Sequence, residues 1–114
     1  LEEYGVKPEN GEDLTAGNHM IFEVEGDSMI PTIQPKSKIL CEKIKPECWE
    51  TAKGVVVVIY DKTLTVKRVL KNNLYMSNAL TLKADNIIHG ELIVERAEIR
   101  AMWQAVRVVS MKIQ

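Results

Sequence analysis

The chain has 114 residues, of which 46% are hydrophobic and 27% charged, with a net charge of -1. This length and balance are typical of a single globular domain. The near-zero charge argues against strong DNA binding by this segment, because phosphate binding needs an excess of Lys and Arg. No apolar run approaches the roughly 20 residues that cross a bilayer, so we expect no membrane association.

Cysteine and histidine usage argues against a metal enzyme. Cys41 and Cys48 are not spaced as C-x-x-C, and no second pair completes a zinc site. We expect His19 and His89 to be surface or loop residues rather than ligands. No metal or cofactor is therefore expected, and both cysteines are expected to stay reduced, as in a cytoplasm.

In chain order, residues 1–18 are polar, contain glycine and proline, and are predicted to form an extended arm or linker. Residues 19–114 form the predicted domain. Alternating or β-branched stretches predict strands at 19–25, 38–44, 54–60, 63–70, from 74 to 77, at 91–94 and at 102–113. Loops are expected at 29–36, 45–53 and 83–90, and one helical turn at 95–100.

The clearest of these elements is 54–60, which is β-branched almost throughout and should be buried on both faces. Asp61-Lys62 is a two-residue connection, so 54–77 is predicted to be a three-strand meander. In the last strand, alternation places Trp103, Ala105, Arg107 and Val109 on one face. The pattern predicts a mostly-β fold of seven or eight antiparallel strands with little helix.

The first functional candidate is Ser28, within the stretch from Gly26 to Thr32. Gly26 permits a backbone conformation that other residues adopt at a cost, and Pro31 restricts the exit from the corner. One interpretation is an ordinary loop with an Asx turn at Asp27. The other is a sharp corner that presents a serine hydroxyl.

The second candidate is Lys67, in the middle of the strand predicted at 63–70. It is either a lysine on a solvated edge or a lysine that points inward. Burial lowers the pKa of a lysine, and a neutral amine can remove the proton of a serine hydroxyl. Ser-Lys pairs perform this chemistry without histidine.

Two motifs resemble those of the LexA-like self-cleaving serine peptidases. The stretch 24–33, Val-Glu-Gly-Asp-Ser-Met-Ile-Pro-Thr-Ile, is similar to the nucleophile motif, and 65–69, Thr-Val-Lys-Arg-Val, to the general-base motif. They occur in the family's order, with Lys67 39 residues after Ser28. The segments 82–86 and 99–101 are also similar to the family, so the resemblance covers about residues 19–110.

The resemblance implies a LexA/signal-peptidase-like β-domain in which Ser28 is the nucleophile and Lys67 the general base. It further implies that the Ser28 amide contributes to an oxyanion hole and that Met29 lines the site. Such domains form homodimers, largely through the C-terminal strand, here 102–113. In transcriptional repressors of the SOS response, such domains follow a helix-turn-helix DNA-binding domain. That DNA-binding domain is expected to be missing from this chain. The resemblance also implies that a RecA-type filament activates cleavage.

Other interpretations remain open. One is a dimerisation and ligand-sensing module whose peptidase activity has lapsed, and another is an accessory subunit of an error-prone polymerase with the same fold. A signal peptidase is disfavoured, since no membrane anchor and no glycine-rich segment after Lys67 is present. The stretch 35–38, Pro-Lys-Ser-Lys, departs from the family's Gly-Asp and alters a turn.

The site of cleavage is expected to lie before Leu1 or to have been lost. Ala16-Gly17 is the one Ala-Gly pair. However, a strand at 19–25 runs roughly 23 Å toward Ser28, at about 3.3 Å per residue. The two residues between this bond and the strand cannot carry it back to Ser28. We therefore expect the chain to be stable to self-cleavage.

Overall fold

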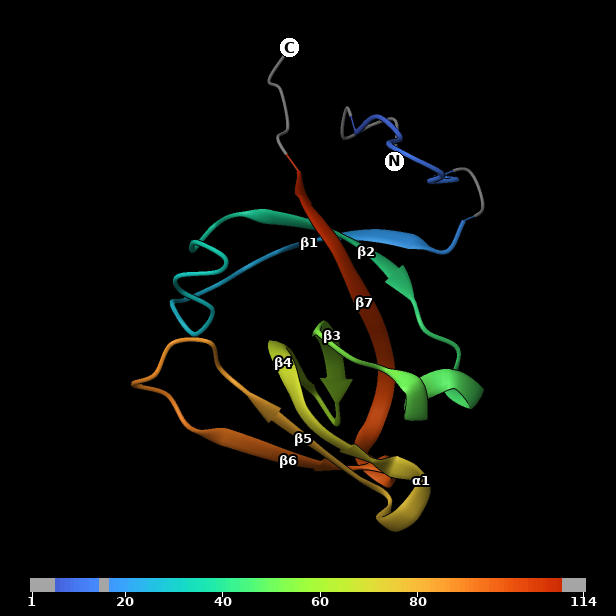
Figure 1. Cartoon of the computed structure of the whole chain (residues 1–114), viewed down its shortest axis with the longest axis vertical. Helices are drawn as coiled ribbons and strands as arrows, with labels where there is room; N and C mark the ends of the chain where they lie inside the picture. The colour runs from blue at the N-terminus through green and yellow to red at the C-terminus, as the bar shows by residue number, and fades with distance from the viewer. Residues whose placement is uncertain (1–5, 15–16, 110–114) are drawn as a thin grey trace.

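The computed structural model describes residues 6–14 and 17–109, and within them the prediction of a mostly-β fold is confirmed (Figure 1). One antiparallel sheet has the strand order β1-β2-β7-β3-β4-β5-β6. The elements are β1 (His19–Glu23), β2 (Lys38–Lys43), η2 (a 3-10 helix, Pro46–Thr51), β3 (Val55–Tyr60), β4 (Thr63–Asn73), α1 (Leu74–Ser77), β5 (Ala79–Lys83), β6 (Glu91–Glu95), η3 (a 3-10 helix, Arg96–Glu98) and β7 (Ile99–Val109).

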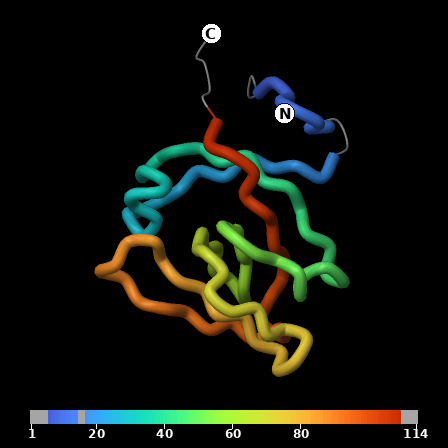
Figure 2. Tube along the Cα trace, in the orientation of Figure 1, coloured from blue at the N-terminus to red at the C-terminus, as the bar shows by residue number. Residues whose placement is uncertain are grey.

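The sheet curls, so that elements far apart in the sequence meet. The trace in Figure 2 brings the loop after β1 close to the loop between β5 and β6 at one side of the molecule. A hydrogen bond from the Asn86 N–H to the Ser28 carbonyl, 2.9 Å long, joins these two loops. This closure positions the serine corner.

Strand β3 is the centre of the core. Val56 and Val58 belong to one buried cluster, whereas Val57 lies in a second cluster on the opposite face. The prediction that this run is buried on both faces is therefore confirmed. The turn at Asp61-Lys62 is also confirmed, because Tyr60 pairs with Thr63 and Asp61 has a φ of 50°.

The prediction of a strand that starts at Leu74 is wrong. Strand β4 continues to Asn73, residues 74–77 form α1, and the third strand of the meander is β5. Asn72 explains the change of direction, because its side chain donates to the carbonyls of Trp49 and Ala52 and accepts from the Leu74 N–H. Asn78, in the left-handed conformation, ends the helix.

The loop predicted at 45–53 contains the short helix η2, whose Trp49 is buried. The helical turn expected at 95–100 is η3, where Glu95 and Glu98 form a capping box.

The last strand differs from its predicted pattern because it contains an irregularity. Leu40 pairs with Arg107 and Cys41 with Ala105, so Val106 is an extra residue in β7. Consequently Trp103 and Ala105 pack in the second cluster, whereas Val109 packs with Leu40 in a third. The strand begins at Ile99 rather than at residue 102, and residues 110–113 lie outside the described part.

Part of the predicted arm is docked on the sheet. Val6 is buried against Leu40 and Val109. Arg107 binds Glu12, with donor–acceptor distances of 3.0 and 3.2 Å, and lies 2.9 Å from Glu9. Gly17 comes just before β1, while Ala16 lies outside the described residues.

Candidate active site

Ser28 lies on a corner between β1 and β2. Val24 extends the pairing of β1 through hydrogen bonds with Ser37 and Lys36, and Gly26 then turns the chain with a φ of 76°. This is the left-handed conformation that glycine adopts at the least cost. Met29 is fully buried in the second cluster and anchors the corner from within the core. Ser28 itself is half-buried.

Lys67 lies in the middle of β4, opposite Val56 of β3. Its Nζ donates a hydrogen bond of 2.7 Å to Oγ1 of Thr65, which is itself buried. Burial lowers the pKa of Lys67 below its usual value, because the ammonium is partly removed from water. A larger fraction of this side chain is therefore neutral than in an exposed lysine.

Ser28 and Lys67 line the same pocket, which has a volume of about 330 Å³. Its other lining residues are Glu23, Glu25, Leu64, Thr65 and Val66. No hydrogen bond joins Ser28 and Lys67 in this structure, and the amine donates to Thr65. Met29 is not among the side chains that line this pocket.

The hydroxyl and the main-chain N–H of Ser28 are available for a ligand. Within the described part of the chain, neither its hydroxyl nor its main-chain N–H has a hydrogen-bond partner, whereas its carbonyl accepts from Asn86. An unpaired N–H beside a candidate nucleophile is what stabilisation of an oxyanion requires. Whether it serves that purpose stays a prediction.

The loop between β5 and β6 braces the corner from outside. Besides the N–H of Asn86, its side-chain amide donates to the Asp27 carbonyl over 3.0 Å. His89 Nε2 lies 2.9 Å from a carboxylate oxygen of Asp27. His89 is exposed on this loop, as expected. These contacts hold the main chain of Ser28 and the residue before it, Asp27.

Asp85 connects the corner to β4. Its carboxylate accepts two hydrogen bonds from Arg68, of 2.8 and 2.9 Å, and one from the Thr32 hydroxyl. The Arg68 guanidinium, and then the Thr32 hydroxyl, hold the pKa of Asp85 at about 2 against the opposing effect of burial. Arg68 directly follows Lys67 in β4, and Thr32 lies in the same corner segment as Ser28. Asp85 therefore connects the segment that carries Lys67 to the segment that carries Ser28.

We therefore expect Asp85→Asn to lower the free energy of unfolding by roughly 1.5–3 kcal/mol, the range for hydrogen bonds to charged groups. The folded-state pKa of Asp85 is depressed, so its stabilisation is present above its ordinary pKa and lost as the pH falls toward about 2. Urea denaturation of both proteins at pH 7 and pH 2 measures this. Asp61→Asn is the matched control, since its ion pair with Arg100 is more than half exposed on both sides. A loss equal to that of the control would contradict the assignment.

Thr65 was not singled out as a site residue from the sequence, although it shares a face with Lys67 two positions away. We expect Thr65→Val to lower the cleavage rate roughly tenfold to a hundredfold, because the amine loses the acceptor that positions it. Thr65→Ser keeps the hydroxyl and should retain most of the rate. The rate of peptide cleavage at saturating substrate distinguishes the two variants. Equal rates for Thr65→Val and Thr65→Ser would show that the Thr65 hydroxyl does not position the amine.

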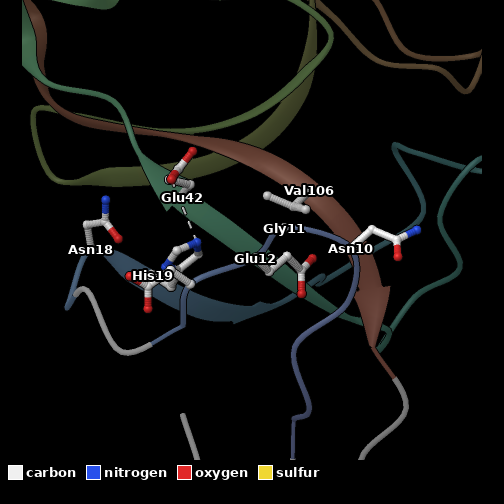
Figure 3. A pocket seen from close by; sticks show the side chains of 8 residues that line it. Asn10, Gly11, Glu12, Asn18, His19, Glu42 and Val106 are labelled. Atoms are coloured by element: carbon white, nitrogen blue, oxygen red, sulfur yellow. Dashed lines mark ion pairs between the residues drawn. The ribbon is translucent and has the colours of Figure 1, made fainter.

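A second pocket, of about 280 Å³, lies between the arm and the sheet and is lined by Asn10, Gly11, Glu12, Asp13, Asn18, His19, Glu42 and Val106 (Figure 3). His19 differs from its expected surface or loop position. It is in β1, its side chain is 7% exposed, and Nε2 lies 3.8 Å from Glu42. None of these lining residues is a serine, cysteine or lysine, so the pocket offers no nucleophile of the kind found beside Lys67.

The cysteines are free thiols with no place in either pocket. Burial raises the pKa of Cys41 to about 12, so this thiol stays protonated at neutral pH and is a poor nucleophile. Among the described residues, no group of three His, Cys, Asp or Glu side chains is arranged to hold a metal ion.

Comparison with known proteins identifies the family of this chain. No helix among the described residues is long and apolar enough to cross a membrane. Searches of curated proteins and of solved structures gave no match. The family model described as Peptidase S24-like matches residues 3–108, which include both Ser28 and Lys67. The chain therefore belongs to the Peptidase S24-like family, the serine peptidase family of the LexA C-terminal domain.

Proposed function

We propose that this chain is a serine peptidase domain in which Ser28 is the nucleophile and Lys67 the general base. The observation that carries the proposal is that both residues, 39 positions apart in the sequence, line one pocket. A partly buried lysine with a lowered pKa has the property that such a base requires.

The proposed reaction has two stages, the formation of an ester on Ser28 and the hydrolysis of that ester. The neutral Lys67 amine keeps its hydrogen bond to Thr65 and takes the hydroxyl proton on its lone pair as Ser28 Oγ attacks the peptide carbonyl. The Ser28 N–H donates to the oxyanion that forms. The Lys67 ammonium then gives its proton to the departing amine, which leaves an ester on Ser28. Neutral Lys67 next activates water, which hydrolyses the ester and restores the hydroxyl.

The proposed biological role is that of a transcriptional repressor that inactivates itself. Cleavage would separate this domain from a helix-turn-helix DNA-binding domain, through which alone the protein would bind DNA. A RecA-type filament is the activator proposed from the family resemblance. The first test is cleavage of a ten-residue peptide containing an Ala-Gly bond by the 114-residue chain at pH 9. Product formation by the wild type and not by Ser28→Ala supports the role of Ser28.

One observation favours a second candidate. The Lys67 amine binds Thr65 rather than Ser28, the arrangement also expected of a dimerisation and sensing module without activity. In that case the same peptide would remain intact at every pH.

We also propose a homodimer formed through β7. Met102 and Trp103 are buried in the core, and Met111 lies outside the described residues. Val108, however, is 52% exposed, and Val106, which also lines the pocket between the arm and the sheet, is 44% exposed. Neighbouring apolar side chains exposed on one strand are typical of an interface between copies.

We expect the wild type to sediment as a dimer at high micromolar concentration and Val108→Glu as a monomer, because a carboxylate would be buried without a partner. Ile93→Glu is the control, since Ile93 is 64% exposed on the edge strand β6. A monomeric wild type, or a dimer that survives Val108→Glu, would contradict the assignment to β7.

A further inference from the structure

The pocket beside Ser28 lies between two strand edges without a neighbour. Strand β4 pairs with β5 only from Arg68 onward, so within the described part of the chain residues 63–67 pair with β3 alone. Strand β1 ends the sheet and pairs only with β2. An unpaired strand edge is a template for an extended peptide, which it binds through main-chain hydrogen bonds.

The wall of the pocket formed by the end of β1 and the residues just after it is acidic. Glu23 and Glu25 line it from alternate positions, and their side chains interact with each other. Lys38 lies 3.1 Å from Glu23 and, more than the contact with Glu25, lowers the pKa of that carboxyl. Lys36 adds a weaker attraction. Neither lysine lines the pocket, and in the described residues no cation is paired with Glu25.

The opposite wall is suited to the stem of a long side chain. Leu64 lines the pocket and is 47% exposed, although it is apolar. Lys67 is the one basic residue among those lining the pocket, and the proposed mechanism uses its neutral form. A Lys or Arg side chain places its methylene groups on apolar surface and its charge beside carboxylates.

From these contacts we propose the substrate class of this site, which rests on the function proposed above. The segment that is cleaved binds as an extended strand between residues 23–28 and 63–67. It carries a Lys or Arg whose charge pairs with Glu25 and Glu23, and the Leu64 side chain covers its stem. An acidic residue at the same place is repelled.

The test uses ten-residue peptides that share an Ala-Gly bond and differ at one position at a time, where Lys, Gln or Glu is placed. At one position or more we expect the 114-residue chain to cleave the Lys peptide roughly tenfold faster, in kcat/KM, than the Glu peptide. A tenfold ratio corresponds to about 1.4 kcal/mol, and attraction of the Lys peptide and repulsion of the Glu peptide both contribute to it. Glu25→Gln should reduce this ratio to near one, and Glu47→Gln, an exposed change on η2 outside both pockets, should not.

A binding measurement separates this inference from the proposed reaction. The same peptides, fluorescently labelled and added to Ser28→Ala, should bind in the order Lys, then Gln, then Glu, as measured by fluorescence anisotropy. Adding Glu25→Gln to Ser28→Ala should abolish this difference in affinity between the peptides. Cleavage without any preference for Lys would overturn the substrate class and leave the peptidase standing. Selective binding without cleavage by the wild type would overturn the peptidase and keep the binding surface. Neither binding nor cleavage would overturn both.

Discussion

Replacing Ser28 with alanine is expected to reduce peptide cleavage by about 10³-fold or more, to the background level, as removal of a serine nucleophile does elsewhere. The fold should be unaffected. Within the described residues the Ser28 hydroxyl has no hydrogen-bond partner, so the free energy of unfolding should change by less than about 0.5 kcal/mol. Peptide cleavage and urea denaturation measure the two quantities.

Ser37→Ala is the matched control. Ser37 is a half-buried serine on the same connection between β1 and β2, but it does not line the pocket. It should retain full activity. Residual cleavage by Ser28→Ala above that of a blank would mean that another group is the nucleophile.

Replacing Lys67 with methionine is expected to abolish cleavage to a similar extent. Arginine should fail as well, since its guanidinium remains charged and cannot accept a proton. In the wild type, cleavage should accelerate as the pH rises from neutral, because deprotonation of Lys67 produces the active form. The rate should level off at a pH below the usual lysine pKa, since burial lowers the pKa of this residue.

The pH profile of kcat/KM between pH 6 and pH 11 provides the measurement. Lys71→Met, an exposed change further along β4, is the control and should leave both the rate and the profile as in the wild type. A rate that is flat or falls across this range would exclude lysine as the base.

The features that were predictable from the sequence are those with a local signal. The β-branched run in β3 predicts a strand buried on both faces because few other structures accommodate it. Ser28 and Lys67 stood out because each lies in a short motif whose residues suit one chemistry. The two-residue turn after Tyr60 follows from the spacing of two alternating runs.

The features that were missed depend on tertiary contacts. Asp85 reaches Thr32 and Arg68 only because the sheet curls, and no periodic pattern records that closure. The extra residue at Val106 reverses the faces of β7, although the alternation in sequence continues through it. Helix α1 replaced a predicted strand because Asn72 binds the distant carbonyls of Trp49 and Ala52.

The central claim is that Lys67 activates Ser28, and labelling with a fluorophosphonate tests it without any assumption about the substrate. This reagent phosphonylates an activated serine oxygen and releases fluoride, so intact mass followed by peptide mapping identifies the modified residue. We predict one adduct, on Ser28, that forms faster as the pH rises and does not form in Lys67→Met. Labelling of Ser28 at equal rates in the wild type and in Lys67→Met, or no labelling of the wild type up to pH 10, would contradict the claim.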